Sequence, residues 1–448
     1  MRDLMKAELY RFYVGALILA FFHCGLLIFL DRVEDTLQQP LLVYRVYLGV
    51  FSLVSLFFGA YQVSSYTQPV SWIQLMHRPT SGGRIGSAIM LAGLTLLVLV
   101  VALPVALLLP FHAEFGNGTV ESRHMLMPAG AFLVTATAYL IGVYIRIGPR
   151  IRAISAVLLL IWIYNTDASG IASVFIQALA AITAFLLALG YFRPDPEAQM
   201  ALPARLLGHG ILLLAIAVVG TFILRFVMQL GLMLLGAHPL NGIPPVGGLV
   251  EASRSEGAAL LVAGLNDAKD QRAKFWSEQV QLSEVATLTT ELTAAPRRFS
   301  VTNLIGNSFD DDLAKLTWTF SHSDMRYSAI DKATRKHVDK IAPSPRLQGP
   351  PITSGDGKFI MAGAEIYSYD PRSHRFSRRV SLPHQEVFAA SPKPQWDIVS
   401  LITDRKLRLY DQRAVASGMT AVVPVREIAL PQPIGDRKST RLNSSHRP

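Results

Sequence analysis

The first 236 residues of this 448-residue chain contain seven strongly apolar segments, and the remainder contains none. About 20 apolar helical residues are needed to cross a bilayer core about 30 Å thick. The first, third and sixth segments reach that length almost without charge. The pattern predicts a membrane α-helical bundle of about 6–7 transmembrane helices, followed by a water-soluble C-terminal part. The segments are Phe12–Leu30, Val46–Tyr61, Ala88–Phe111, Ala129–Ile145, Ile151–Tyr164, Ile171–Phe192 and Ile211–Gly236.

The basic residues between these segments predict which way the chain runs, because cytoplasmic loops are enriched in Lys and Arg. If the N-terminus is inside, the outside loops carry only Arg32, Arg45 and Arg123. Seven crossings then make this a multi-pass protein of the cytoplasmic (inner) membrane with an extracytoplasmic C-terminal domain. The inside segments carry ten basic residues, namely Arg2, Lys6, Arg11, Arg78, Arg84, Arg146, Arg150, Arg152, Arg193 and Arg205.

Two segments leave the number of crossings open. The fifth has 14 residues between Arg152 and Asp167 and fits either a short crossing or a re-entrant piece. The seventh is 26 residues long with Arg225 in its middle, and it fits one tilted helix or a helix pair. Either revision would move the C-terminal part inside. An arginine at membrane depth indicates a functional or ion-paired group, so Arg225 is a candidate site residue.

The loop after the second segment predicts a short amphipathic helix on the inside face. Thr67 can cap this helix and Pro69 fits its first turn. Pro79 and the pair Gly82–Gly83 end it. From their spacing we expect its apolar residues to lie close to one face, which would rest on the membrane surface. These residues are Val70, Trp72, Ile73, Leu75 and Met76.

The stretch Leu75–Ile85, LMHRPTSGGRI, resembles a segment of ABC-2 type transporter permease subunits, Leu-x-His-Arg-Pro-x-Ser, between their second and third spans. The basic lead MRDLMKAELYRF also resembles this family, and the similarity covers roughly residues 1–200. It implies a dimer of permeases and a coupling helix that docks on a cytoplasmic ABC ATPase subunit. The coupling surface would consist of Trp72, Leu75, His77, Arg78 and Arg84. The family usually has six spans, so the seventh segment and the C-terminal extension depart from its pattern.

The chain has no P-loop of its own. Ser354–Lys358, SGDGK, lacks the first glycine and the hydroxyl residue of that motif. We therefore expect a transport subunit and not an enzyme, with export powered by a separate ATPase. No cofactor or metal site is expected, because no cluster of residues with metal-ligand spacing stands out in the sequence. No nucleic-acid partner is expected either, because the formal charge of +10 is ordinary for basic loops at a membrane. The alternative is a membrane-anchored sensor or binding protein with an extracytoplasmic β-domain.

The C-terminal part divides into a linker at 237–296, with helical character at Leu260–Val280, and a β region at 297–435. Three stretches of the β region resemble one another, each with a strand ending in an aspartate: Asp331, Asp370 and Asp411. A period near 40 residues resembles β-propeller blades, and a β-sandwich is the alternative. Bonding within an Asx-turn explains these aspartates better than catalysis. The carboxylates Asp310–Asp312 are expected in an exposed turn.

The last residues differ in kind from the rest. Asp436–His446, DRKSTRLNSSH, resembles a translated sequencing adapter. We therefore expect residues 436–448 to be a non-native tail and the β-propeller-like domain to be truncated near Gly435. Propellers need about four to eight blades, and only the three similar stretches precede the tail. The small number of stretches agrees with a truncated domain.

Overall fold

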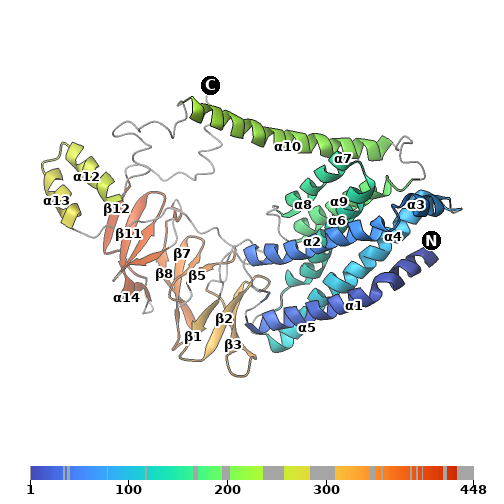
Figure 1. Ribbon diagram of the computed structural model, residues 1–448. Helices are drawn as coiled ribbons and strands as arrows, with labels where there is room; N and C mark the ends of the chain where they lie inside the picture. Colours follow the sequence, from blue (N-terminus) through green and yellow to red (C-terminus); the bar gives the residue numbers. More distant parts are fainter. Residues whose placement is uncertain are drawn as a thin grey trace. The chain divides into compact units, whose positions relative to one another are not determined.

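A bundle of apolar helices precedes a C-terminal region of antiparallel sheets in the computed structural model, which confirms the predicted fold class (Figure 1). The structure describes residues 2–33, 36–37, 41–77, 79–116, 119–164, 170–193, 202–235, 257–282, 308–343, 347, 349–354, 357–383, 386–389, 392–395, 397–416 and 421–430. Six of the helices in these ranges are long and apolar enough to cross a membrane. They are Arg2–Val33, Val43–Ser64, Gly82–Phe115, His124–Ile147, Gly170–Leu189 and Leu202–Leu234.

The helices follow the predicted apolar segments, but most extend beyond them. They are α1 (Arg2–Val33), α2 (Leu41–Ser64), α3 (Pro69–Met76), α4 (Gly82–Leu97), α5 (Leu103–Phe115), α6 (Met127–Ile147), α7 (Arg150–Ser155), α8 (Val157–Tyr164), α9 (Gly170–Leu189) and α10 (Leu202–Leu234). A π-helical turn, η1 (Val98–Ala102), joins α4 to α5, and a 3₁₀ turn, η2 (His124–Leu126), precedes α6. The seventh apolar segment is one helix, α10, and not a helix pair.

Contacts between helix ends define two ends of the bundle. At the near end, the start of α1 meets the end of α2, where Gln62 Nε2 donates to Glu8 Oε2 at 2.8 Å. At the far end, the end of α1 meets the end of α5, where His112 Nδ1 lies 2.7 Å from Asp31 Oδ1. Helices α1 and α2 are therefore antiparallel, and the continuous helix α4–η1–α5 runs from the near end to the far end.

Helices α6 and α9 run parallel, although only α7 and α8 separate them in sequence. A Cβ on Gly130, early in α6, would lie 3.3 Å from Gln177 Oε1 of α9. Late in both helices, the rings of Tyr144 and Tyr191 are 5.3 Å apart. Two parallel neighbours require the chain between them to run back along the bundle.

The fifth apolar segment makes that return. Tyr164, the last residue of α8, donates a hydrogen bond to the carbonyl of Arg45 near the start of α2, at the far end. Helices α7 and α8 together cover Arg150–Tyr164, which at 1.5 Å per residue is about 22 Å and less than a bilayer core of about 30 Å. The segment is thus shorter than the six long helices, yet it extends from the near end to the far end.

Two glycines allow α2 and α6 to approach each other closely. A Cβ on Gly59 of α2 would lie 2.1 Å from the carbonyl oxygen of Tyr139. A Cβ on Gly142 of α6 would lie 2.0 Å from the carbonyl oxygen of Leu56. Small residues at such positions let membrane helices pack backbone against backbone.

The chain divides into two compact units, and the division falls within α10. One unit consists of Met1–Leu213 with Leu292–Pro448, and the other of Leu214–Glu291. The second unit contains α12 (Gly257–Asp267) and α13 (Ala273–Leu282), which account for the helical character expected at Leu260–Val280. The rest of the predicted linker, at 237–256 and 283–296, and the tail at 436–448 lie outside the described residues.

The β region consists of three four-stranded antiparallel sheets, each made of consecutive strands. None of the three closes on itself within the described ranges. The first contains β1 (Ser308–Asp311), β2 (Leu316–Ser321), β3 (Arg326–Asp331) and β4 (His337–Ile341). The second contains β5 (Ile352–Thr353), β6 (Ile360–Ala362), β7 (Glu365–Asp370) and β8 (Arg375–Ser381). The third contains β9 (Lys393–Gln395), β10 (Ile398–Ile402), β11 (Lys406–Asp411) and β12 (Arg426–Ala429).

The three repeated aspartates each end the third strand of a sheet, and their predicted turn role is confirmed. Asp331 Oδ1 accepts the backbone N–H of Thr334 at 2.6 Å, and Asp370 Oδ1 accepts that of Arg372 at 3.1 Å. Asp411 Oδ1 accepts the N–H of Ala414 at 3.0 Å, but there a helical turn, α14 (Gln412–Ala416), replaces the short hairpin turn.

Neighbouring sheets share cores of aromatic and aliphatic side chains. Trp318 of the first sheet is fully buried and donates from Nε1 to the Tyr369 hydroxyl of the second sheet at 3.1 Å. Asp311 is also buried and accepts the Tyr369 hydroxyl at 2.8 Å. The expectation of an exposed turn is therefore wrong for Asp311, whose carboxylate joins two sheets, while Asp310 and Asp312 are exposed.

Candidate functional site

The predicted amphipathic helix between the second and third spans is α3, and one of its faces packs on the bundle. Its N-cap is Gln68, and Pro69 occupies its first turn. Leu75 is only 4% exposed and belongs to the main hydrophobic core. The ring of Trp72 lies 6.0 Å from that of Phe192, at the chain segment that follows α9. These contacts hold α3 against the near end of the bundle.

The opposite face of α3 is uncovered. Val70 is 68% exposed and Ile73 is 55% exposed. The expectation that Val70 and Ile73 lie close to the same face as Trp72 and Leu75 is therefore wrong. Positions two residues apart on a helix point about 200° apart, so the two pairs lie on opposite sides.

The five predicted coupling residues thus separate into different environments. Trp72 and Leu75 face the bundle, whereas His77 and Arg84 are exposed at the same end. Arg78 lies outside the described residues. The outward face that a partner could contact therefore includes Val70 and Ile73, which the sequence prediction had not selected.

Two glycines, Gly82 in the LMHRPTSGGRI stretch and Gly86 just after it, have a packing role. A Cβ on Gly82 would lie 2.3 Å from the carbonyl oxygen of Phe192, and one on Gly86 would lie 2.5 Å from its ring. Only glycine allows the segment after α9 to lie directly on the first turns of α4. Because Trp72 also stacks on Phe192, the position of α3 is linked to the ends of both α4 and α9.

A buried polar cluster lies behind α3 at the near end. Glu8 is almost fully buried and accepts hydrogen bonds from Gln62 and from the Tyr66 hydroxyl. The Gln62 amide oxygen accepts the Tyr139 hydroxyl at 2.6 Å, so α1, α2 and α6 are joined through one side chain. Burial, and then the bond to Glu8, raises the pKa of Tyr66 to about 12, so its phenol remains a donor.

This cluster is not among the sites that the sequence predicts. The available signal was the presence of Glu8 and Gln62 within otherwise apolar helical stretches, since buried polar groups need partners. Arg11, counted only as a charge near the membrane surface, lies 3.7 Å from Glu8 and donates to Ser65 at 2.8 Å. The cluster can fix the relative positions of three helices at the end where α3 is attached.

A second buried polar group lies at the far end, before α6. Arg123 Nε lies 2.7 Å from Glu121 Oε2, and both side chains are buried. Glu121 Oε1 also accepts the backbone N–H of His322, in the turn between β2 and β3, at 3.0 Å. The Oγ atoms of Ser122 and Ser323 are 3.0 Å apart. The loop before α6 therefore bonds directly to the first sheet.

Arg225 is exposed in the C-terminal third of α10. Within the ranges that the structure describes, no acidic side chain pairs with it. In the same ranges, no group of three or more His, Cys, Asp and Glu side chains is arranged to hold a metal ion. No family model matches the chain, and a search of curated proteins finds no relative.

Proposed function

We propose that the chain is the membrane-spanning permease subunit of an ABC-type transporter, powered by a separate ATPase and acting as a dimer of permeases. The observation that carries the proposal is the two-sided helix α3. Its inner face, with Trp72 and Leu75, fixes it to the bundle. Its outer face presents the apolar side chains of Val70 and Ile73 beside exposed His77. An apolar centre with a polar rim is typical of an interface for another protein.

In this proposal, ATP-driven movement of the partner displaces α3, and the displacement is transmitted through Phe192 to α4 and α9. The near end faces the cytoplasm, where the basic residues gather. Residues Arg11, Arg84 and Arg146 all lie at this end of the bundle, which supports the placement.

We further propose that the β region is extracytoplasmic and propeller-like. Two features support this placement. The return of the chain through α7 and α8, followed by α9 and α10, makes seven crossings if α10 spans the bilayer once. The bond from the His322 N–H to Glu121 lies at the far end, opposite α3. Three sheets of four consecutive strands each match the architecture of propeller blades.

The coupling proposal is tested by isolating the tagged chain from its native membranes in mild detergent and measuring the P-loop ATPase that accompanies it. Ile73→Asp places a charge in the centre of the outer face and should remove both the ATPase and its stimulation by the permease. Ile73→Leu keeps the apolar contact and serves as the matched control. Arg78→Glu is predicted to uncouple ATP hydrolysis from transport while the complex still assembles.

Absence of any P-loop ATPase from the wild-type complex would contradict the proposal. An unchanged complex and unchanged ATPase stimulation in Ile73→Asp would reject α3 as the docking element. The loop–sheet contacts favour a second candidate, a membrane-anchored sensor whose β region transmits ligand binding to α6. Arg335, in the turn between β3 and β4 of the first sheet, also donates a hydrogen bond to the Phe115 carbonyl at 2.8 Å. Ligand binding by the chain without an associated ATPase would support that candidate.

A further inference from the structure

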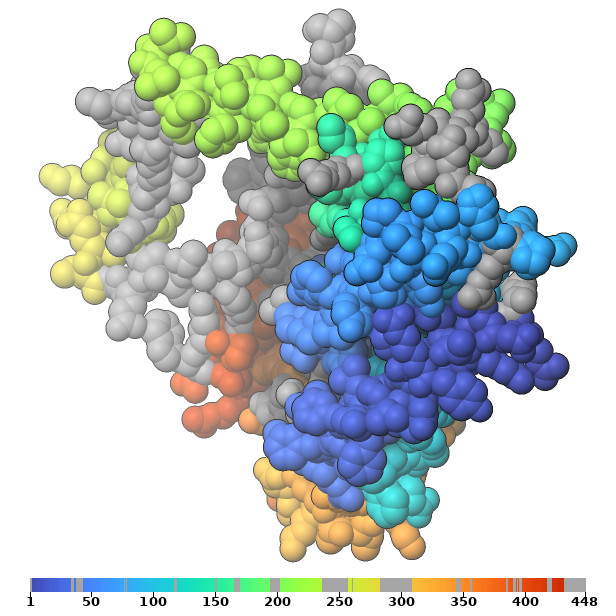
Figure 2. All heavy atoms as spheres, turned by 45° about the vertical axis from the view of Figure 1, so that its right-hand side comes forward, coloured from blue at the N-terminus to red at the C-terminus, as the bar shows by residue number. Residues whose placement is uncertain are grey.

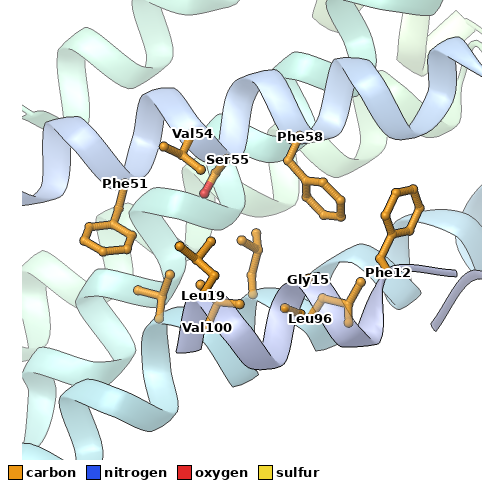
Figure 3. Close-up of a pocket in the computed structure, with 12 residues that line it drawn as sticks. Phe12, Gly15, Leu19, Phe51, Val54, Ser55, Phe58, Leu96 and Val100 are labelled. Carbon is orange, nitrogen blue, oxygen red and sulfur yellow. The ribbon is translucent and has the colours of Figure 1, made fainter. Parts of the chain in front are cut away.

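An apolar cavity lies between α1 and α2, at a depth where both helices cross the membrane. Helix α1 packs mainly on α4, η1 and α5, whereas α2 packs mainly on α6, so the two helices leave a space between them. The cavity has a volume of about 210 Å³. Figure 3 shows Phe12 and Leu19 of α1 pointing toward Phe51 and Phe58 of α2, with Val100 of η1 beneath them.

The lining is hydrocarbon apart from one hydroxyl, that of Ser55. A water molecule in a cavity needs two to four polar partners, which this lining does not offer. An apolar cavity of about 150 Å³ is enough to hold a benzene molecule, so this one has room for several carbon atoms in sequence. The lining therefore favours a hydrocarbon occupant.

The cavity opens toward the surrounding lipid. Leu19 and Val54 line it and are 37% and 47% exposed, so they form a rim on the outer surface of the bundle. The neighbouring side chains Ile18 and Leu53 are apolar and still more exposed. In Figure 2, α1 (dark blue) lies uncovered on the face that is drawn. A hydrocarbon chain can enter from the bilayer without passing any charged group.

Aromatic contacts bound the cavity at both ends. Toward the near end, the rings of Phe12 and Phe58 meet edge to face at 5.4 Å. Toward the far end, the Phe51 ring lies 4.2 Å from the imidazole of His23. His23 Nδ1 in turn bonds to the Val100 carbonyl of the π-helical turn at 2.6 Å. Such turns are frequent at functional sites, and this one forms the floor of the cavity.

We infer that this cavity binds one acyl chain of a bilayer lipid, which enters between α1 and α2 and lies along α1. The occupant is a membrane lipid because the rim is surrounded by the lipid-facing surfaces of both helices. The site requires only that the chain spans a membrane, and it is independent of the coupling role of α3. A bound acyl chain would fill the space between α1 and α2 and contact both helices where they do not contact each other.

Two glycines of α1 provide a matched pair of variants. Gly15 lines the cavity, and a Cβ placed on it meets nothing within 4 Å. Gly25 has the same free space but does not line the cavity. Gly15→Phe therefore fills the cavity, while Gly25→Phe adds the same ring to the same helix elsewhere. Leu19→Trp is a second blocking variant, which replaces one large apolar side chain at the exposed rim of the cavity by a larger one.

The full chain is reconstituted in vesicles that contain phosphatidylethanolamine with a diazirine in its acyl chain, then irradiated and mapped by mass spectrometry. Labelling is expected to concentrate on the peptides around Gly15 and Ser55. It should fall several-fold in Gly15→Phe and Leu19→Trp and stay unchanged in Gly25→Phe. A parallel sample uses diazirine-bearing palmitic acid in ordinary vesicles.

Even labelling of all outward-facing helices, or equal labelling in Gly15→Phe and Gly25→Phe, would overturn the site. Labelling by the fatty acid but not by the phospholipid would overturn its assignment to a bilayer lipid. Retained helicity and monodispersity of each variant in detergent are required, and Leu19→Trp decides the result if Gly15→Phe does not fold.

Discussion

The close packing of α2 on α6 predicts that one added methyl group will destabilise the bundle. In Gly142→Ala, the new Cβ would lie 2.0 Å from the Leu56 carbonyl oxygen, a backbone atom that cannot rotate away. The helices must separate there by about 1.4 Å, the difference between this distance and the 3.4 Å at which ordinary contact begins. A gap of only 0.5–1 Å already forfeits roughly a quarter to a half of the dispersion energy of the facing atoms.

The magnitude follows from two opposing effects. Alanine is favoured over glycine within a helix by about 1 kcal/mol, and this gain applies equally to Gly25→Ala, where nothing lies within 4 Å of the new Cβ. Overpacking costs about 1–3 kcal/mol and applies only to Gly142→Ala. Gly142→Ala should therefore be less stable than Gly25→Ala by about 1–3 kcal/mol, since the helical gain cancels in this comparison.

The assay is equilibrium unfolding of each purified variant in mixed micelles of mild detergent and dodecyl sulfate, followed by far-ultraviolet circular dichroism. Gly59→Ala should resemble Gly142→Ala, because its Cβ would meet the Tyr139 carbonyl oxygen at 2.1 Å. If Gly142→Ala unfolds at the same mole fraction of dodecyl sulfate as Gly25→Ala, or at a higher mole fraction, the close approach of α2 and α6 is wrong.

Three further predictions concern topology and the β region. In a background without the native cysteine, an impermeant maleimide added to intact cells should label Leu313→Cys and leave His77→Cys unlabelled. The reverse pattern would refute the proposed placement of α3 and the β region on opposite sides of the membrane. Hydrogen bonds from Thr334 hold the pKa of Asp331 below its ordinary 3.8. The stability that this carboxylate contributes is therefore present above pH 3.8 and is lost as the pH falls through the lowered pKa. Asp331→Asn should make the loss of β-region stability in acid, measured by protease resistance, shallower than in the wild type; an identical acid profile would exclude this role. Trp318→Ala should cost about 3–5 kcal/mol and expose the first two sheets to protease, because it removes a fully buried ring; unchanged resistance would contradict their shared core.

Much of the fold could be predicted because its signals are local. The apolar stretches gave the six long helices, since length and hydropathy decide whether a helix can span a bilayer. Pro69 correctly marked the start of α3. The repeated aspartates marked the ends of β3, β7 and β11, because an Asx-turn depends on the residue and the two or three that follow it.

The candidate site was predicted only in part. The existence of α3 followed from its sequence, but its orientation did not, because both faces carry apolar residues. Trp72 and Leu75 face the bundle only because Phe192, more than a hundred residues later, packs on Trp72. The buried partners of Glu8 were invisible for the same reason, since Gln62 and Tyr66 lie more than fifty residues away.

The sequence by itself determined the long apolar helices, the short helix α3 and the repeating strand–Asp–strand units, because apolar length, helical period and turn chemistry act between near neighbours. Only the tertiary structure decided that α6 and α9 run parallel, that α7 and α8 return the chain between them, and that α1 and α2 separate around a cavity. These features depend on which surfaces meet across long stretches of chain, and Gly142 shows why. Gly142 matters because the carbonyl oxygen of Leu56 in α2 lies too close to it for any side chain to fit.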